Sequence, residues 1–191
     1  MPQAQGFILE KSKEPFFGPS DETPQRTSNP SGLRLRLAKF SDLPHLVKIE
    51  MESFDSDRFS PRTLHRLATR PTSCMLVAEM DGAVVGYAAV LFRAGVRHAR
   101  LYGLCVAKVA RGRGIGSHLL EEAEIRAEKH GKTGMTLEVR CDNPAACILY
   151  ANAGYIEVCQ LPSYYADGCN GFRLIKRLNR FTPSISGKSH P

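Results

Sequence analysis

Glycines alternate with two arginines and an isoleucine in one short stretch of the chain, Arg111-Gly112-Arg113-Gly114-Ile115-Gly116. The stretch follows an apolar run that ends at Val106, and it leads directly into a helical pattern. Amides at the start of a helix have no internal partner, and the helix dipole adds partial positive charge there. Glycines also let the backbone approach a bulky ligand closely. The stretch therefore predicts an anion site that holds a phosphate group.

The residues around these glycines narrow the kind of phosphate ligand. A Walker loop has a lysine and then a serine or threonine after its last glycine, whereas Gly116 is followed by Ser117 and His118. A dinucleotide fingerprint usually follows the first strand, whereas this stretch follows the fourth predicted strand. The remaining alternative is a turn whose glycines serve geometry alone, and the two adjacent arginines argue against it.

A second group of polar residues follows in the chain. Glu138 lies inside an apolar run, and a buried carboxylate is usually either paired or functional. It is therefore a candidate catalytic group or a member of an ion pair, with Arg140 or with another cation. Asn143 can cap a following helix, and Tyr150 stands seven residues later, about two helical turns, on nearly the same face. Taken alone, Tyr150 is also typical of a core aromatic residue.

The pattern Arg-x-x-Gly-x-Gly after an apolar strand resembles the signature of the GNAT superfamily of N-acetyltransferases. The resemblance implies that the backbone of residues 112–117 binds the pyrophosphate of acetyl-coenzyme A. It also implies that residues 104–106 lie alongside the pantetheine arm like an added strand. No metal is implied. The cofactor-binding residues that follow from the resemblance are Leu104, Cys105, Val106, Arg111, Gly112, Arg113, Gly114, Ile115, Gly116, Ser117 and Asn143.

The segment from Glu138 to Tyr155 is similar to a narrower group, the ribosomal-protein-alanine N-acetyltransferases. Its pattern is Glu-Val-Arg-x-x-Asn-x-x-Ala-x-x-Leu-Tyr-x-x-x-Gly-aromatic. By this resemblance Glu138 is the general base, Tyr150 the general acid, and Asn143 a cofactor contact. The implied reaction is direct attack of an amine on the thioester, with a protein N-terminal α-amino group or a lysine as the acceptor. The alternatives are a small-molecule amine as the acceptor and a non-catalytic module that binds coenzyme A.

The acceptor is expected near Phe54–Leu64 and Pro162–Asn170. The first segment stands where the protein-acetylating group has an aromatic-Pro-Trp-like sequence, although this chain contains no tryptophan. In the second, Ser163-Tyr164-Tyr165-x-Asp167-Gly168 is similar to that group's loop before the final strand.

Alternating and helical patterns predict the elements that position these residues. We expect an α/β domain whose mixed, mostly antiparallel sheet is flanked by helices and, by the GNAT resemblance, splayed at a central parallel pair. Helical connections after Val106 and after Arg140 favour parallel pairing. The predicted strands are Leu33–Leu37, Cys74–Met80, Ala83–Phe92, Arg97–Val106, Met135–Arg140, Tyr155–Gln160 and Phe172–Leu178. The predicted helices follow Ser41-Asp42, run from Ser60-Pro61 to residue 69, span residues 115–130, and run from Asn143-Pro144 to Ala153.

The length of 191 residues, with 42% hydrophobic and 24% charged residues, is typical of one globular domain. We expect an N-acetyltransferase domain over residues 33–180, between a flexible extension at 1–32 and a flexible tail at 181–191. No apolar run is long enough for a membrane span and no signal-peptide pattern is seen, which predicts a cytoplasmic protein without membrane partners.

Most of the formal net charge of +7 falls on the predicted domain, which favours an anionic partner such as a polyphosphate cofactor. By the resemblance the partners are acetyl-coenzyme A and an amine acceptor, with no direct nucleic-acid partner. The six cysteines form no CxxC pair and no zinc spacing, so they are expected to be small buried residues with free thiols. Cys105 as a nucleophile is the less favoured alternative.

Overall fold

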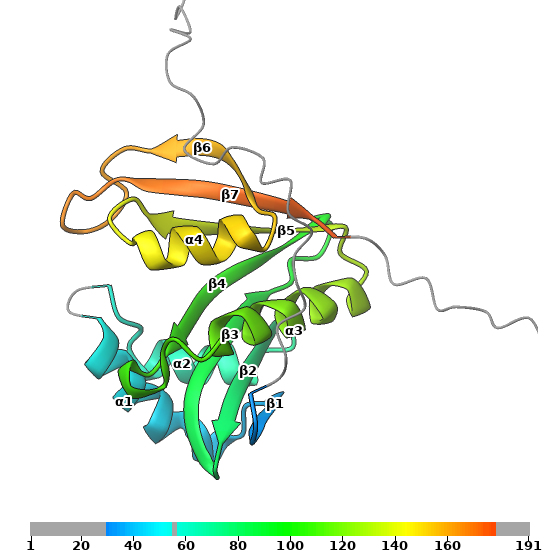
Figure 1. The fold of residues 1–191 in the computed structure, drawn as a ribbon. Coiled ribbons are helices and arrows are strands. Elements are labelled where there is room, and N and C mark those ends of the chain that lie inside the picture. Colours follow the sequence, from blue (N-terminus) through cyan, green and yellow to red (C-terminus); the bar gives the residue numbers. More distant parts are fainter. Residues whose placement is uncertain (1–29, 55–56, 179–191) are drawn as a thin grey trace, which may run out of the picture.

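A computed structural model describes residues 30–54 and 57–178, which form seven strands and four α-helices (Figure 1). The order of strands and α-helices is the predicted one, and two short 3-10 turns, Phe40–Asp42 and Lys108–Ala110, are added to it. The predicted tail lies outside the described residues, as does the predicted extension apart from residues 30–32. The elements are β1 Leu33–Leu37, α1 Leu43–Ser53, α2 Pro61–Thr69, β2 Ser73–Met80, β3 Ala83–Leu91, β4 His98–Val106, α3 Ile115–Lys129, β5 Gly134–Arg140, α4 Pro144–Asn152, β6 Ile156–Leu161 and β7 Gly171–Arg177.

The seven strands form one sheet in the order β1-β2-β3-β4-β5-β7-β6, and β4 and β5 are its parallel pair. Only residues 98–101 of β4 pair with residues 134–137 of β5. Beyond this short register the two strands separate, which confirms the expected splay at the centre of a mostly antiparallel sheet. The connection through α4 does not produce a second parallel pair, because β7 lies between β5 and β6 and is antiparallel to both.

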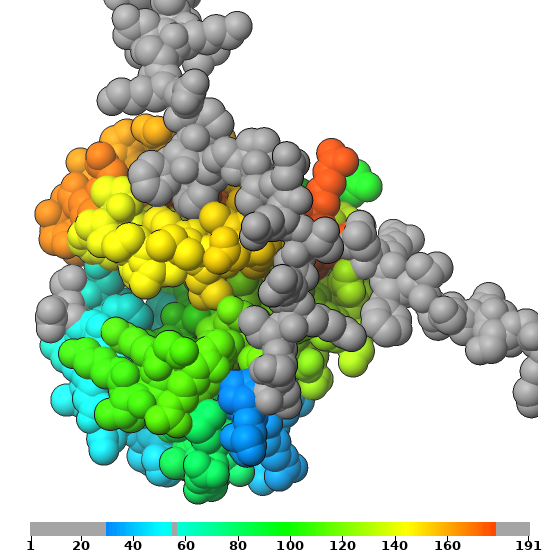
Figure 2. Space-filling model, viewed as in Figure 1, coloured from blue at the N-terminus to red at the C-terminus, as the bar shows by residue number. Residues whose placement is uncertain are grey.

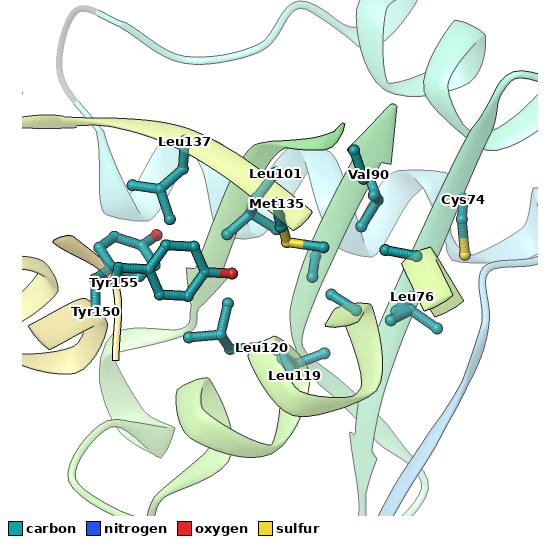
Figure 3. Close-up of a cluster of buried hydrophobic side chains, with 14 of the residues drawn as sticks. Cys74, Leu76, Val90, Leu101, Leu119, Leu120, Met135, Leu137, Tyr150 and Tyr155 are labelled. Atoms are coloured by element: carbon teal, nitrogen blue, oxygen red, sulfur yellow. The ribbon is translucent and has the colours of Figure 1, made fainter. Parts of the chain in front are cut away.

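Two clusters of buried side chains form the core, one on each face of the sheet. Strand β2 shows the division, because Leu76 and Ala78 belong to one cluster while Met75 and Val77 belong to the other. This alternation is the period-two pattern of a strand that is covered on both faces. Helices α3 and α4 pack on the first cluster, part of which is drawn in Figure 3, and α1 and α2 pack on the second. Each fully buried leucine side chain contributes about 1.5–3 kcal/mol to folding.

Helix starts and turns are set by local side-chain and glycine chemistry. The Ser60 hydroxyl accepts a hydrogen bond from the Thr63 amide at 3.2 Å, and the Asn143 side chain accepts one from the Ala146 amide at 3.1 Å. Both are N-cap interactions, which satisfy amides that have no partner inside the helix. Asp81-Gly82 between two predicted strands is a two-residue hairpin signal in the sequence, and this hairpin is confirmed, since residues 81 and 82 have φ values of 51° and 79°.

In the sequence Ser41 and Asp42 look like a cap for the helix that follows them, but this cap is not formed. Asp42 stands at the N-cap position of α1, but its side chain makes no capping hydrogen bond to that helix. Instead, its carboxylate accepts hydrogen bonds from the Arg36 guanidinium at 2.7 and 2.9 Å and from the Lys39 amide at 2.6 Å. The ion pair with Arg36 lowers the pKa of Asp42. The half-buried guanidinium competes successfully for the carboxylate because it pairs two full charges through two hydrogen bonds, whereas a cap joins the carboxylate to a neutral amide.

The prediction of six buried thiols is wrong for half of the cysteines. Cys74, Cys105 and Cys147 are buried, whereas Cys141 and Cys159 are exposed and Cys169 is half-exposed. The exposed ones lie on the edge strand β6 and in two loops, where no second layer covers them. None of the helices in the described part of the chain is long and apolar enough to cross a membrane.

Candidate active site

The turn between β4 and α3 is built from backbone groups. Gly112 and Gly114 have φ values of 75° and 74°, in the left-handed region that other L-residues rarely adopt. Gly114 is the N-cap residue of α3, and its carbonyl accepts the first helical bond from the His118 amide at 3.2 Å. The amides of residues 115–117 therefore precede the helical ladder and have no partner within it. Three amides at a helix start form a site for an anion.

Gly116 brings the start of α3 close to β4. A Cβ atom at Gly116 would lie 3.5 Å from Leu149 of α4, 3.8 Å from Leu104 and 3.9 Å from Val106. The helix start is therefore adjacent to the part of β4 that has no strand partner on its β5 side.

The two arginines of the turn are exposed and bond to neighbouring protein atoms. The Arg111 Nε donates to the Val106 carbonyl at 3.0 Å, and the Arg113 guanidinium lies 3.5 Å from the Met80 sulfur. Both charges thus remain beside the turn, where they add to the positive potential of the helix start.

Two of the predicted cofactor-binding residues have buried side chains. Cys105 belongs to the core under α1 and α2, and Ile115 belongs to the core under α3. Any ligand contact from either residue must come from its backbone. Burial also raises the pKa of the Cys105 thiol to about 11, which keeps it protonated and argues against the nucleophile alternative.

A cavity of about 620 Å³ opens where β4 and β5 separate. In Figure 2 the surface is hollowed between α4, in yellow, and the β4–α3 turn, in green. The cavity wall includes four of the predicted site residues, Leu104, Glu138, Asn143 and Tyr150. Both segments in which the acceptor is expected also reach it, the first through Phe59 and the second through a pair of tyrosines, Tyr164 and Tyr165.

Glu138 is a nearly buried, doubly paired carboxylate, with a side chain that is 9% exposed. The Arg100 guanidinium donates to Oε2 at 2.7 Å, and the Arg173 Nε donates to Oε1 at 3.0 Å. The interpretation of Glu138 as a member of an ion pair is thus confirmed. Its partners are Arg100 and Arg173, and Arg140 is not among them. Oε2 also accepts from the Arg100 Nε at 2.9 Å, whereas Oε1 has the one partner Arg173, so Oε1 is the oxygen that can still accept from a water or an amine.

Arg140 instead holds an acidic cluster at the end of β5. Its guanidinium contacts Asp57 at 2.8 Å, Asp167 at 2.7 Å and Asp142 at 2.9 Å. The same group lies 4.8 Å above the Tyr165 ring. These contacts explain why Arg140 does not pair with Glu138. Through Asp57 and Asp167 they also join the two segments in which the acceptor is expected to the end of β5.

Tyr150 points from α4 into the first core cluster and also lines the cavity. Its ring lies edge-on to Tyr155 with 5.8 Å between centroids, as Figure 3 shows. Burial raises the pKa of the Tyr150 hydroxyl, so the group is a proton donor at neutral pH. Asn143 uses its carbonyl oxygen for the α4 cap, which leaves its amide nitrogen for a ligand.

Several cavity residues are missed by sequence reasoning. Glu50, Tyr87 and Arg100 line the cavity beside Glu138 but belong to no contiguous motif. For Glu50 a signal exists, because it follows Leu46 by one helical turn and so lies on the apolar face of the predicted helix. For Arg100 and Tyr87 the strand pattern gives no such indication.

Comparison with known proteins identifies relatives over most of the chain. A family model described as the acetyltransferase (GNAT) family matches residues 41–155. An uncharacterised N-acetyltransferase of Methanocaldococcus jannaschii is 35% identical over 144 residues, which cover 74% of this chain and 90% of that protein. An N-alpha-acetyltransferase of Sulfurisphaera tokodaii is 31% identical over 147 residues, covering 71% of this chain and 87% of the relative.

A solved structure agrees with these sequence matches. The ribosomal-protein-alanine N-acetyltransferase from Brucella melitensis superposes with a TM-score of 0.66 at 26% identity. The match covers 76% of this chain and 99% of that one.

Proposed function

The chain belongs to the GNAT family of acetyltransferases, and from that premise we propose that it acetylates the α-amino group of a protein N-terminus. The family implies acetyl-coenzyme A as the co-substrate. Two relatives support the proposed acceptor, since one is named an N-alpha-acetyltransferase and the other a ribosomal-protein-alanine N-acetyltransferase.

The observation that carries the proposal is the continuity between the turn and the cavity. Leu104 lines the cavity, and it also lies 3.8 Å from the Cβ position of Gly116 at the start of α3. A ligand whose phosphates rest on the start of α3 can therefore extend along β4 into the cavity that holds Glu138 and Tyr150.

The turn fits a pyrophosphate group. Its glycines adopt left-handed conformations, no side chain fills the space at Gly112 or Gly114, and the first amides of α3 have no helical partner. We assign the pyrophosphate to residues 111–117, where backbone amides and two arginines balance its charge. Residues 104–106 would bind the pantetheine arm along their unpaired edge, in the manner of an added strand.

The thioester of acetyl-coenzyme A supplies a carbonyl carbon that an amine can attack. An α-amino group has a pKa near 8 and is mostly protonated at neutral pH. We assign Glu138 as the general base that takes this proton, directly or through water. Arg100 and Arg173 orient its two oxygens and neutralise its charge before the proton arrives.

We assign Tyr150 as the general acid, which donates its proton to the departing sulfur. Its hydroxyl is protonated at neutral pH, as that of a tyrosine ordinarily is, and burial raises its pKa further. An amide on the unpaired edge of β4 near Val106 would stabilise the negative charge that develops on the carbonyl oxygen. Holding two substrates in one cavity supplies the remaining rate enhancement through proximity.

The proposal is tested with the full chain, acetyl-coenzyme A and three kinds of acceptor. The acceptors are unblocked peptides, the same peptides with a blocked N-terminus and one lysine, and a panel of small amines. We expect release of the coenzyme A thiol with unblocked peptides at least about ten times faster than with the others, a difference of about 1.4 kcal/mol. Mass spectrometry should locate the acetyl group on the α-nitrogen. Faster transfer to lysine or to a small amine would contradict the proposed acceptor. Thiol release at the same rate with and without any acceptor would contradict acetyl transfer altogether.

A further inference from the structure

Glu50 is a buried carboxylate in the cavity wall that takes no part in the proposed reaction. It lies near the end of α1 and is 2% exposed. A glutamate is almost never fully buried unless its oxygens are satisfied. Burial raises the pKa of Glu50, so its placement costs free energy at neutral pH.

Both oxygens of Glu50 have partners on other elements. Oε1 accepts a hydrogen bond from the Tyr87 hydroxyl of β3. Oε2 accepts one from the backbone amide of Phe59, at 2.5 Å. One carboxylate thus fixes the chain that precedes α2 to both α1 and β3.

The Phe59 ring lies against the part of β4 that has no strand partner on its β5 side. It stacks on Tyr102 with 5.1 Å between centroids and 4° between planes. Its edge would lie only 2.6 Å from a Cβ atom at Gly103, so this close approach requires glycine there. The Arg100 guanidinium, which pairs with Glu138, lies 5.3 Å from the centroid of the Tyr102 ring.

We propose that Glu50 is a positioning residue for the acceptor. It holds Phe59 against β4 and so fixes the stacked rings of Phe59 and Tyr102, which form the cavity wall beside Glu138. This inference rests on the proposed function. Stacking and cation–π contact connect Phe59 through Tyr102 to Arg100, which orients the proposed base. Displacement of Phe59 therefore disturbs the acceptor side, while the turn at residues 111–117 keeps its geometry.

Two substitutions of Glu50 separate positioning from simple loss of packing. Glu50→Ala removes the acceptor of the Phe59 amide, whereas Glu50→Gln keeps a carbonyl oxygen of the same size at that place. We expect Glu50→Ala to raise the peptide KM about tenfold, the usual consequence of losing one buried hydrogen bond. Glu50→Gln should stay within about threefold of the unmodified chain. Both variants should bind acetyl-coenzyme A as the unmodified chain does.

Equal peptide KM values for the two variants would overturn the inference, as would a parallel loss of acetyl-coenzyme A affinity. If Glu50→Ala does not fold, Phe59→Ala supplies the second test, because Phe59 is only half-buried and its loss should raise the peptide KM in the same way. The unmodified chain is assayed in parallel. If the best acceptor of the unmodified chain is an amine other than a protein N-terminus, the proposed function fails. The KM of Glu50→Ala and Glu50→Gln for that amine then still tests the role of Glu50.

A different observation concerns two cysteines that neighbour the cavity residues Arg140 and Asp167 in the sequence. The sulfur atoms of Cys141 and Cys169 lie 3.6 Å apart. Cys141 directly follows β5 and is exposed, while Cys169 stands two residues before β7 and is half-exposed. The backbone holds them in place, since the Cys141 amide donates to the Asn170 carbonyl at 3.0 Å.

This pair connects two parts of the site. The Cys169 amide donates to Asp167 at 3.0 Å, and Asp167 in turn binds Arg140. Cys141 is followed by Asp142 and by Asn143, the cap of α4. A covalent bond between the sulfurs would tie the loop that carries Tyr164 and Tyr165 to the turn that starts α4.

We infer that Cys141 and Cys169 are a site of reversible disulfide formation by a peroxide. One thiolate attacks the peroxide oxygen, which yields a sulfenic acid and, for hydrogen peroxide, one water. The second thiolate displaces hydroxide from that sulfur, and this leaves as a second water. Two thiols lose two electrons and two protons in all, and the peroxide accepts them. The sulfurs, 3.6 Å apart, must approach by about 1.5 Å to reach disulfide distance.

The full chain is treated with hydrogen peroxide, and its thiols are counted by alkylation and mass spectrometry. Cys141→Ser and Cys169→Ser are compared with Cys159→Ser, a matched control, because Cys159 is also exposed but lies on the edge strand β6. The unmodified chain and the control should each lose two thiols and yield one cross-linked peptide that contains residues 141 and 169. Neither pair variant should form that peptide.

Oxidation should also change the peptide KM at least about threefold in the unmodified chain and the control, and a dithiol reductant should reverse the change. A cross-link that involves another cysteine, or oxidation to sulfinic acid without a cross-link, would overturn the inference. An unchanged peptide KM after complete cross-linking would overturn the effect of the disulfide on the acceptor side.

Discussion

The β4–α3 turn and the cavity at the splay of β4 and β5 are adjacent, yet they are built in different ways. The turn is one continuous stretch of chain, and backbone amides with left-handed glycines make its surface. The cavity is lined by side chains from α1, β3, β4, β5, α4 and the loops around them. Leu104 of β4 joins the two, because it lines the cavity and lies 3.8 Å from the Cβ position of Gly116.

The difference has a physical origin. A backbone site needs only a local conformation, so it can be supplied by a short motif and tolerates change elsewhere in the chain. A side-chain site needs several elements to meet, and each of its polar groups requires a partner once it is buried. The turn therefore suits a ligand that is common to a whole family, and the cavity wall suits an acceptor that differs between members.

The largest effect is expected from Glu138→Gln, which changes the cavity and leaves the turn intact. The amide keeps the size of the side chain but cannot take a proton, so kcat should fall about 10²- to 10⁴-fold. The measurement is the initial rate of thiol release at saturating peptide. A kcat within threefold of the unmodified chain would exclude Glu138 as the base.

Tyr150→Phe should have a smaller effect, because a thiolate leaves more readily than an amine. We expect kcat to fall about 10- to 100-fold, at or below the lower end for general acid catalysis. Tyr155→Phe is the matched control, since Tyr155 packs against Tyr150 in the same core but is not part of the cavity wall. An equal loss in both variants would attribute the effect to packing.

Gly114→Ala breaks the turn and spares the cavity. A residue other than glycine at φ 74° costs about 1 kcal/mol of stability, and the turn should relax away from its binding geometry. Gly131→Ala at the other end of α3, with φ 72°, is the matched control, because a Cβ atom would meet nothing within 4 Å at either position. Denaturant titration should show similar destabilisation for both variants. Only Gly114→Ala should weaken acetyl-coenzyme A binding, by about tenfold, and equal weakening would refute the assignment of the turn.

The smallest effect is a pH dependence that belongs to the cavity wall alone. Burial raises the pKa of Glu50 from its ordinary value of 4.5, so folding favours the protonated form. The stabilising contribution of protonated Glu50 is complete below the ordinary pKa, and it is lost as pH rises through the raised pKa. The unfolding free energies of the unmodified chain and of Glu50→Gln are measured by urea titration at several pH values. The value of the unmodified chain should fall relative to that of Glu50→Gln as pH rises above 4.5. A difference that is constant or grows with pH would contradict the burial argument.

The order and type of the elements can be predicted from the sequence because each depends on local periodicity and turn chemistry. The strand at Leu33–Leu37, the helix that starts at Ser60-Pro61 and the hairpin at Asp81-Gly82 are examples, and all three are observed. The family signature at the turn can be recognised for the same reason, since its residues are contiguous.

Features that depend on which surfaces meet could not be predicted. The position of β7 between β5 and β6, the binding of Asp42 by Arg36 and the approach of Cys141 to Cys169 all join residues distant in the sequence or compete with a local alternative. Glu50 could have been recognised as a polar residue on an apolar helix face, but its partners Tyr87 and Phe59 could not.

The division of labour between the turn and the cavity is tested most directly by calorimetric titration of acetyl-coenzyme A into two variants, Gly114→Glu and Glu138→Gln. Gly114→Glu places a bulky anionic side chain at the proposed pyrophosphate site and should abolish detectable binding. Glu138→Gln should bind with a Kd within about twofold of the unmodified chain, although it turns over poorly. Retained binding by Gly114→Glu, or lost binding by Glu138→Gln, would contradict the account.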